Sequence, residues 1–359
     1  MKKIDIYIIR KFLGTFFFAL GLIVAIAIVF DLSEKMDDFI DRNASLQVVI
    51  FDYYLNFIPY FANLFSGLFV FISVIFFTSK MAQSSEFIAM LSNGMSFKRI
   101  LLPYFIAAAI ITAFTFSLGN FVIPSANKVR LEFQENYLKG SGATIGAIDM
   151  HRQISPGVYI YLESFNITRN VGYRLTLEKF ENSKLVSKLY ADNMIWDSIT
   201  NKWILQSYYI RTFDGLNETL VEGNRLDTAI NIHPKDFTKK KEIVEAMNRV
   251  ELNDYIAKQQ MMGTPEVVNS EIEKYSRIAT PFSTFILTMI GVTLSARKRK
   301  GGMGLNIGIG ILLSFSYVLF MRFSSMFAIN AVFPASFAVW IPNILYALIA
   351  FGLYFSAPK

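Results

Sequence analysis

The chain of 359 residues contains no cysteine and only two histidines, His151 and His233. Without cysteine there is neither a disulfide nor a thiolate metal site, and two histidines at no ligand-like spacing do not form a metal or catalytic cluster. The sequence also lacks a Gly-x-x-x-x-Gly-Lys-Ser/Thr loop, so it carries no nucleotide-binding loop of this kind. We therefore expect no catalytic residue, no metal and no cofactor in the chain itself.

Charge is absent from six long apolar runs, although 18% of the residues are charged. At about 1.5 Å per residue, each run is long enough as a helix to cross a hydrocarbon core about 30 Å thick. Three runs precede a polar insert from Asn127 to Tyr275, and three follow it. The runs extend over Phe12–Phe30, Tyr53–Ser79, Ile100–Ala126, Ile278–Ala296, Met303–Met321 and Phe337–Ser356. The fold class that we predict is a membrane α-helical protein with six transmembrane helices, three plus three around one water-exposed domain.

The net charge of +7 is concentrated next to the ends of the apolar runs. Twelve basic residues share one expected side of the membrane with only Asp5 and Glu86, which gives that side +10 and the remainder −3. They are Lys2, Lys3, Arg10, Lys11, Lys80, Lys98, Arg99, Arg297, Lys298, Arg299, Lys300 and Lys359. This is the positive-inside asymmetry of a membrane protein, whereas a nucleic-acid partner would need basic residues gathered on one folded face. We expect both termini in the cytoplasm of a bacterial inner-membrane protein, its insert in the periplasm, and no nucleic-acid partner.

Inside the insert, the hydrophobic period changes. Val158–Leu162, Arg174–Leu177 and Trp203–Arg211 are rich in β-branched and aromatic residues and are bounded by turn formers. Asp197–Lys202 is expected to connect two strands as a hairpin, and Lys239–Tyr275 returns to helical spacing. We predict membrane helices over residues 1–126, an all-β, jellyroll-like periplasmic domain over 127–238, a helical connector over 239–276, and membrane helices over 277–359.

The expected cytoplasmic loop over residues 80–99 is predicted to contain a short helix at about residues 84–95. Ser84 and Ser85 are good N-cap residues, and Gly94 suits the C-terminal end. Apolar residues that share one face of this helix are Phe87, Met90 and Leu91. Two interpretations are open: the helix lies in the lipid headgroups, or it docks a cytoplasmic partner.

Four segments resemble, in order along the chain, the lipopolysaccharide-export permeases of the LptF/LptG family, also called YjgP/YjgQ. The loop segment Ser85–Ser96 (SEFIAMLSNGMS) is similar to the coupling-helix signature of that family. The others are Asp5–Arg10 before the first run, Gly157–Ile160 in the insert and Arg277–Pro281 at the fourth run. The resemblance covers essentially the whole chain, and it is closer to LptG than to LptF at the N-terminus and in the insert.

The resemblance implies a permease subunit of an ABC exporter. In the family, an LptF and an LptG subunit pair, a cytoplasmic ABC ATPase dimer binds their coupling helices, and lipopolysaccharide enters the cavity between the subunits. The β-jellyroll domains connect that cavity to a periplasmic bridge through LptC. ATP and Mg belong to the partner ATPase on this reading, because the chain has no nucleotide-binding loop. The residues implied in coupling to the ATPase are Ser85, Glu86, Phe87, Met90, Leu91 and Gly94.

Five basic residues are candidates for binding lipid or for gating. Arg322 lies at the outer end of the fifth run, where a charge at membrane depth indicates a functional site, unless its stem snorkels to the headgroups. The resemblance implies that the first and fifth spans form lateral gates and that basic residues at the outer mouth hold lipid A phosphates. The candidates there are Lys35, Arg42, Lys128 and Arg130, with a solvated surface role as the alternative for each.

Two other classes of function compete with export. A membrane-embedded enzyme would need polar groups that converge at one depth, and the runs supply mainly isolated Ser, Thr and Asn without His or acid. A membrane-anchored receptor or scaffold would use the β-domain to bind periplasmic partners, for example by strand addition at an exposed sheet edge, without transporting lipid. ATP-dependent release of lipid to a periplasmic acceptor separates export from the scaffold function.

Overall fold

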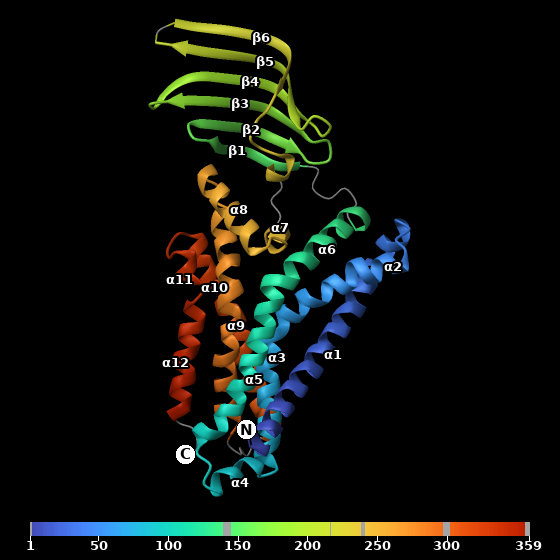
Figure 1. Ribbon diagram of the computed structural model, residues 1–359, viewed down its shortest axis with the longest axis vertical. Coiled ribbons are helices and arrows are strands. Elements are labelled where there is room, and N and C mark those ends of the chain that lie inside the picture. The colour runs from blue at the N-terminus through green and yellow to red at the C-terminus, as the bar shows by residue number, and fades with distance from the viewer. Residues whose placement is uncertain (1, 139–144, 216, 238–240, 297–301, 356–359) are drawn as a thin grey trace. The chain divides into compact units, whose positions relative to one another are not determined.

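The computed structural model describes residues 2–138, 145–215, 217–237, 241–296 and 302–355, and its chain forms two compact units (Figure 1). The first, here the membrane unit, comprises Met1–Leu138, Val244–Arg249 and Val268–Lys359. The second, here the β domain, comprises Lys139–Ile243 and Val250–Val267. Of the residues that carry the predicted charge asymmetry, Arg297–Lys300 and Lys359 lie outside the described residues.

Within the described residues, six helices are long and apolar enough to cross a membrane, which confirms the predicted fold class. Two of the six are continuous helices built from several labelled segments: α2 (Leu46–Val48), η1 (Val49–Tyr54) and α3 (Leu55–Gln83), and then α5 (Phe97–Ser117), η2 (Leu118–Val122) and α6 (Ile123–Tyr137). The other four are α1 (Lys3–Asp41), α9 (Val267–Ser295), α10 (Gly302–Ile329) and the span Ala335–Phe355, which consists of the short α11 (Ala335–Ala338) followed by α12 (Ile341–Phe355).

Several of these helices extend beyond the apolar runs. The helix α1 has 39 residues, so the polar segments on both sides of the Phe12–Phe30 run are helical too. The segments η1 and η2 are π-helical, a local widening that is often found at functional sites. Hydropathy marks only the part of a helix that lies in lipid, and it therefore underestimates the length of helices with polar ends.

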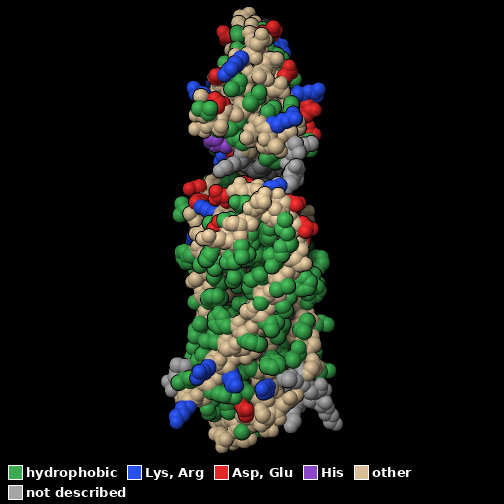
Figure 2. Space-filling model, turned by 90° about the vertical axis from the view of Figure 1, so that its right-hand side faces the viewer, with side chains coloured by type: hydrophobic (Ala, Val, Ile, Leu, Met, Phe, Trp, Pro, Cys, Tyr) green, Lys and Arg blue, Asp and Glu red, His purple; other side chains and the backbone are tan. Residues whose placement is uncertain are grey.

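The surface of the membrane unit is apolar around its middle. Large side chains such as Phe18 (73% exposed) and Leu312 (67% exposed) point outward. Figure 2 shows a broad band of such hydrophobic side chains, with lysine and arginine gathered below it. That basic end is the one at which α4 (Glu86–Ser92) lies (Figure 1), and it is called the α4 end below. A band of this kind is what a hydrocarbon solvent requires.

Inside the membrane unit, α3 packs against α1, α5 and α10. Its buried Thr78 hydroxyl lies 2.9 Å from the Tyr104 hydroxyl of α5, and its Ser79 accepts a hydrogen bond of 3.1 Å from Asn306 of α10. The helix α9 approaches α3 at Gly291, where a Cβ atom would lie 2.9 Å from Val74 Cγ1. Small residues at such crossings allow close backbone contact between membrane helices.

The β domain is built on one antiparallel sheet of six strands whose spatial order follows the sequence. The strands are β1 (Ile145–Ser155), β2 (Val158–Asn166), β3 (Val171–Glu181), β4 (Lys184–Asp197), β5 (Lys202–Asp214) and β6 (Asn217–Thr228). Asp197 pairs with Lys202 and Trp196 with Trp203, which confirms the predicted hairpin. Because each strand pairs with its neighbours in sequence, the described strands form a meander within the predicted all-β class.

One face of the sheet forms the core of the β domain. Trp203 is fully buried, and its indole nitrogen donates a 2.8 Å hydrogen bond to the Ile232 carbonyl. Phe237, in the short η3 (Pro234–Phe237), stacks on Phe165 with 4.3 Å between ring centroids. The helices α7 (Lys241–Glu245) and α8 (Arg249–Met262) follow, and they lie in the region where helical spacing was predicted.

Candidate functional site

The loop between α3 and α5 contains α4, the short helix predicted from the sequence. Ser85 occupies the N-cap position, but its backbone is left-handed (φ 63°) and its side chain makes no capping hydrogen bond. The predicted capping role is therefore wrong, because an N-cap needs an extended backbone to aim its oxygen at the first amides of the helix. Ser84 instead donates to Glu86 Oε1 at 3.1 Å. Gly94 has a φ of 80°, which allows the chain to leave the helix end.

The apolar face of α4 packs against its own chain. Phe87 is fully buried in a cluster with Ile8 and Phe12 of α1, and its ring lies 6.3 Å from that of Phe97 in α5. Met90 and Leu91 are partly buried against the same cluster. These side chains hold the helix in place. The opposite face, with exposed residues at Glu86, Ile88, Ala89, Ser92 and Asn93, is the one that a partner can reach.

Glu86 is the acidic group of this exposed face, and it is oriented by two hydroxyl groups. The Tyr7 hydroxyl of α1 donates to Glu86 Oε2 at 3.1 Å, and Ser84 donates to the other carboxylate oxygen. The carboxylate is thus fixed at the surface, and no basic side chain of the described residues forms an ion pair with it. A basic group on a partner would complete a charge-assisted interaction here.

Two of the five basic candidates, Lys35 and Arg42, are engaged within the chain. Lys35 forms an ion pair with Asp31 one turn earlier, and its ammonium also contacts the Tyr53 hydroxyl. Its nitrogen lies 4.9 Å from the centre of the Tyr53 ring. Arg42 donates to the Asn136 carbonyl at 3.0 Å, where it ties the end of α1 to α6. Both side chains hold helices together at the end of the membrane unit opposite to α4.

The second pair, Lys128 and Arg130, divides between the surface and the interior. Lys128 is exposed on α6, whereas Arg130 is 94% buried, with its guanidinium 4.6 Å above the Tyr60 ring of α3. The Nε of Arg130 and both polar side-chain atoms of the buried Asn127 have no hydrogen-bond partner among the described residues. Arg130 therefore contributes to the packing of α6 on α3, in addition to any role toward lipid.

Arg322 is exposed on α10. The other four candidates lie on α1 (Lys35), at the C-cap of α1 (Arg42) and on α6 (Lys128 and Arg130).

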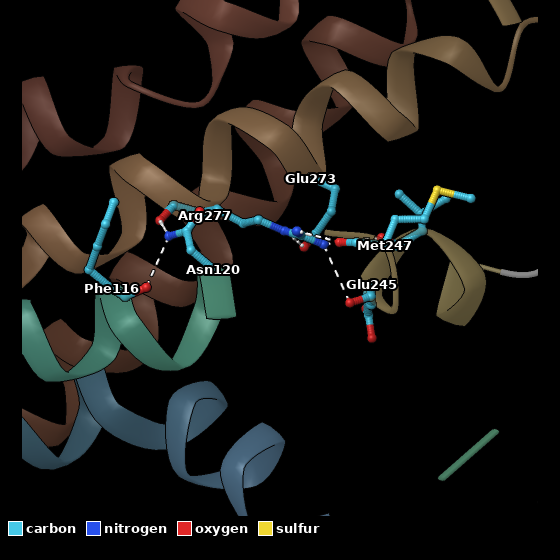
Figure 3. Close-up of polar contacts among 7 residues, drawn as sticks. Phe116, Asn120, Glu245, Met247, Glu273 and Arg277 are labelled. Carbon is cyan, nitrogen blue, oxygen red and sulfur yellow. Dashed lines mark hydrogen bonds and ion pairs between the residues drawn. The ribbon is translucent and has the colours of Figure 1, made fainter. Parts of the chain in front are cut away.

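Arg277, the first residue of the resembling segment Arg277–Pro281, makes four side-chain hydrogen bonds (Figure 3). It is 9% exposed, and its Nε donates to Glu273 Oε1 at 2.9 Å. Its Nη1 donates to the Met247 carbonyl at 2.7 Å, and its Nη2 to those of Val244 (3.1 Å) and Glu245 (3.3 Å). Because α7 ends at Glu245, the carbonyls at and after its end are not paired within the helix, and the guanidinium donates to them; the Val244 carbonyl also accepts the Met247 amide at 3.2 Å.

The backbone of Arg277 is also held. Asn120 of η2 donates to the Arg277 carbonyl at 3.5 Å and to the Phe116 carbonyl at 2.9 Å (Figure 3). This π-helical turn of the third span thus contacts the start of the fourth. The sequence signal was an arginine at the start of an apolar run, where a buried charge requires partners.

The family model of the lipopolysaccharide export system permease LptF/LptG matches residues 6–355, nearly the whole chain. The chain belongs to the LptF/LptG family. The model describes both subunits, so the closer resemblance to LptG stays a prediction. No curated protein matches the chain.

Membership of the LptF/LptG family makes the chain a permease component of lipopolysaccharide export and not itself an enzyme. Together with the six apolar helices, it indicates a multi-pass protein of the inner membrane. It also implies partnership with another Lpt permease subunit and with an ABC ATPase.

Proposed function

We propose that this chain is one permease subunit of an ATP-driven ABC transporter that extracts lipopolysaccharide from the inner membrane and passes it to a periplasmic bridge toward the outer membrane. The observation that carries the proposal is the construction of α4 within a chain of this family. Phe87 anchors one face of α4 in the membrane unit, while Glu86 stays exposed and oriented on the opposite face.

The α4 end of the membrane unit faces the cytoplasm in this proposal. The start of α1, the end of α3 and the start of α5 all meet at this end, and they carry the described basic residues of the predicted inside face. Positive charge near the ends of spans favours the cytoplasmic side. Both termini are then cytoplasmic, and the β domain lies in the periplasm.

The exposed face of α4 binds the ATPase subunit. The chain has no phosphate-binding loop, so ATP and Mg are bound by that partner. Glu86 forms a charge-assisted contact with a basic residue of the ATPase, and Ile88 adds apolar area beside it. Of the residues predicted to couple, Phe87, Met90 and Leu91 act by anchoring α4.

Lipopolysaccharide enters between two paired permease subunits, with α1 and α10 as the walls of the opening. Arg130 and Arg322, near the outer ends of their helices, attract its phosphates. The β domain then hands the lipid to an LptC-type partner. Among the described strands, β1 pairs only with β2 and β6 only with β5, so each has an edge that suits strand addition.

Photo-crosslinking from the walls of the opening tests this proposal. A photoreactive residue is placed at one exposed position of α1 or α10 in turn, at Val29, Phe30, Phe323 or Met326. Lipopolysaccharide adducts are expected at these positions in the assembled complex. Ile6 is the matched control, because it is exposed on the same α1 but lies at the α4 end.

The outcome also separates export from the scaffold function. Adducts that decrease when ATP is added support extraction, since ATP drives the lipid out of the opening. An assembled complex without lipid adducts at all four outer positions contradicts the proposal and favours a scaffold that binds periplasmic partners without moving lipid.

A further inference from the structure

The first turns of α1 contact the coupling loop at both of its ends. Tyr7 donates to Glu86, the first residue of α4, and Asp5 pairs with Arg99, in the first turn of α5. Figure 1 shows the N-terminal part of α1 beside α4. Both polar side chains belong to the segment Asp5–Arg10, which resembles the family.

The two contacts differ in strength. Arg99 Nη1 and Nη2 each lie 2.7 Å from one oxygen of Asp5, and the Asp5 carboxylate also accepts the Lys2 amide at 2.8 Å. Asp5 is only 3% exposed. A bidentate pair between a planar guanidinium and a buried carboxylate is rigid and costly to separate. It fixes the start of α1 to the start of α5.

The contact between Tyr7 and Glu86 is single and exposed. Both side chains are solvent-accessible, and one hydrogen bond of 3.1 Å joins them. Such a hydrogen bond orients the Glu86 carboxylate, and it contributes little free energy, so a bond to a partner can replace it. It leaves the carboxylate of Glu86 oriented but not neutralised, ready for a cation from outside the chain.

We propose that Tyr7 is a positioning residue for the coupling site: its hydroxyl orients Glu86 toward the ATPase and connects α4 to α1, while Asp5 and Arg99 form the fixed pivot beside it. The inference rests on the proposed binding of the ATPase to α4. A displacement of α4 by the ATPase then passes directly to the 39-residue helix α1, which reaches from this loop to the opposite end of the membrane unit.

The test compares Tyr7→Phe with Thr15→Ala in the purified full complex. Tyr7→Phe keeps the ring and removes only the hydroxyl. The control residue, Thr15, lies on the same helix, and its hydroxyl bonds the Lys11 carbonyl one turn earlier. Two readouts are measured: the number of ATP molecules hydrolysed for each lipopolysaccharide transferred, and the distance distribution between spin labels at Lys3 and Asn93. The cysteine-free chain allows specific labelling at these two exposed sites.

Loss of one hydrogen bond to a charged group predicts about a three- to tenfold rise in ATP consumed for each lipid in Tyr7→Phe, with a broader label distance. Thr15→Ala should match the wild type in both readouts. The double variant Glu86→Gln with Tyr7→Phe should consume no more ATP for each lipid than Glu86→Gln alone, because the two residues act as one unit. Additive losses, or an unchanged ATP-to-lipid ratio in Tyr7→Phe, would overturn the inference. If the wild-type complex moves no lipid, the proposed function fails, whereas the label distance still decides whether Tyr7 positions α4.

Discussion

Arg277 Nη1 lies 2.7 Å from the carbonyl oxygen of Met247, thirty residues earlier in the chain. Through this contact and its neighbours, α9 holds the short segment Val244–Arg249 within the membrane unit. A chain that leaves the membrane for a large insert must return at a defined place. In this protein, one buried guanidinium provides that place by capping the end of α7.

Arg277→Lys should destabilise the membrane unit by about 2 kcal/mol, because an ammonium cannot reproduce the fork that binds three carbonyls and Glu273 together. Thermal unfolding of the purified permease measures the effect. The same change at the exposed Arg249, which starts α8, is the control and should leave the midpoint unchanged. Equal midpoints for the two variants would contradict the capping role of Arg277.

Gly291→Ala should destabilise the contact between α9 and α3 by about 1–3 kcal/mol through overpacking. The new methyl group would lie 2.9 Å from Val74 Cγ1, and a valine in a helix has little rotamer freedom to move away. Gly308→Ala on α10 is the control, since its methyl group would have no neighbour within 4 Å. The thermal unfolding midpoints of the two variants are compared in detergent. A Gly291→Ala midpoint at or above that of Gly308→Ala would refute the close contact between α9 and α3.

Phe87→Ala and Ile88→Ala separate the anchoring face of α4 from its docking face. Phe87→Ala removes a fully buried ring and should lower the stability of the permease itself by about 3 kcal/mol. Ile88→Ala should leave that stability unchanged, because Ile88 is 45% exposed, and should reduce the amount of ATPase that co-purifies. Loss of permease stability in Ile88→Ala, with no change in Phe87→Ala, would reverse the assignment of the two faces.

The pair Arg130 and Tyr60 should be energetically coupled. Replacing Arg130 by Gln and Tyr60 by Leu, separately and together, gives a double-mutant cycle on thermal stability. A cation–π contact with 4.6 Å between the guanidinium and the ring, at a buried position, predicts a coupling of about 1 kcal/mol or more. If the two effects simply add, Arg130 is not held by this ring and its role at the outer mouth must be explained differently.

The sequence predicted the features that depend on local patterns. Uncharged runs located the six spans because burial in lipid must hold over every residue of a span. Alternation and turn residues located the hairpin at Asp197–Lys202. The polar extension of α1 past Phe30 was missed, since its helix is stabilised by contacts such as those of Asp31 with Tyr53 and Tyr54, which hydropathy does not record.

The candidate site was predictable in its position along the chain but not in its contacts. The short helix of the coupling loop was located, yet nothing local distinguishes the buried Phe87 from the exposed Ile88 as anchor and docking residue. Lys35 was considered as a lipid ligand because it is basic and near the membrane, whereas its pairing with Asp31 and Tyr53 depends on a second helix. Partners that lie far apart in sequence are set by packing, and a single sequence does not contain that information in readable form.

The most direct measurement of the central claim is ATP-driven transfer of lipopolysaccharide from proteoliposomes that contain the complete complex to a soluble periplasmic acceptor. The wild-type complex should transfer lipid only with ATP and Mg. Glu86→Lys reverses the one acidic group on the exposed face of α4 and should reduce transfer by about tenfold or more, while Glu86→Gln should show a smaller loss. Transfer by Glu86→Lys at the wild-type rate, or transfer by the wild type that does not depend on ATP, would contradict the account.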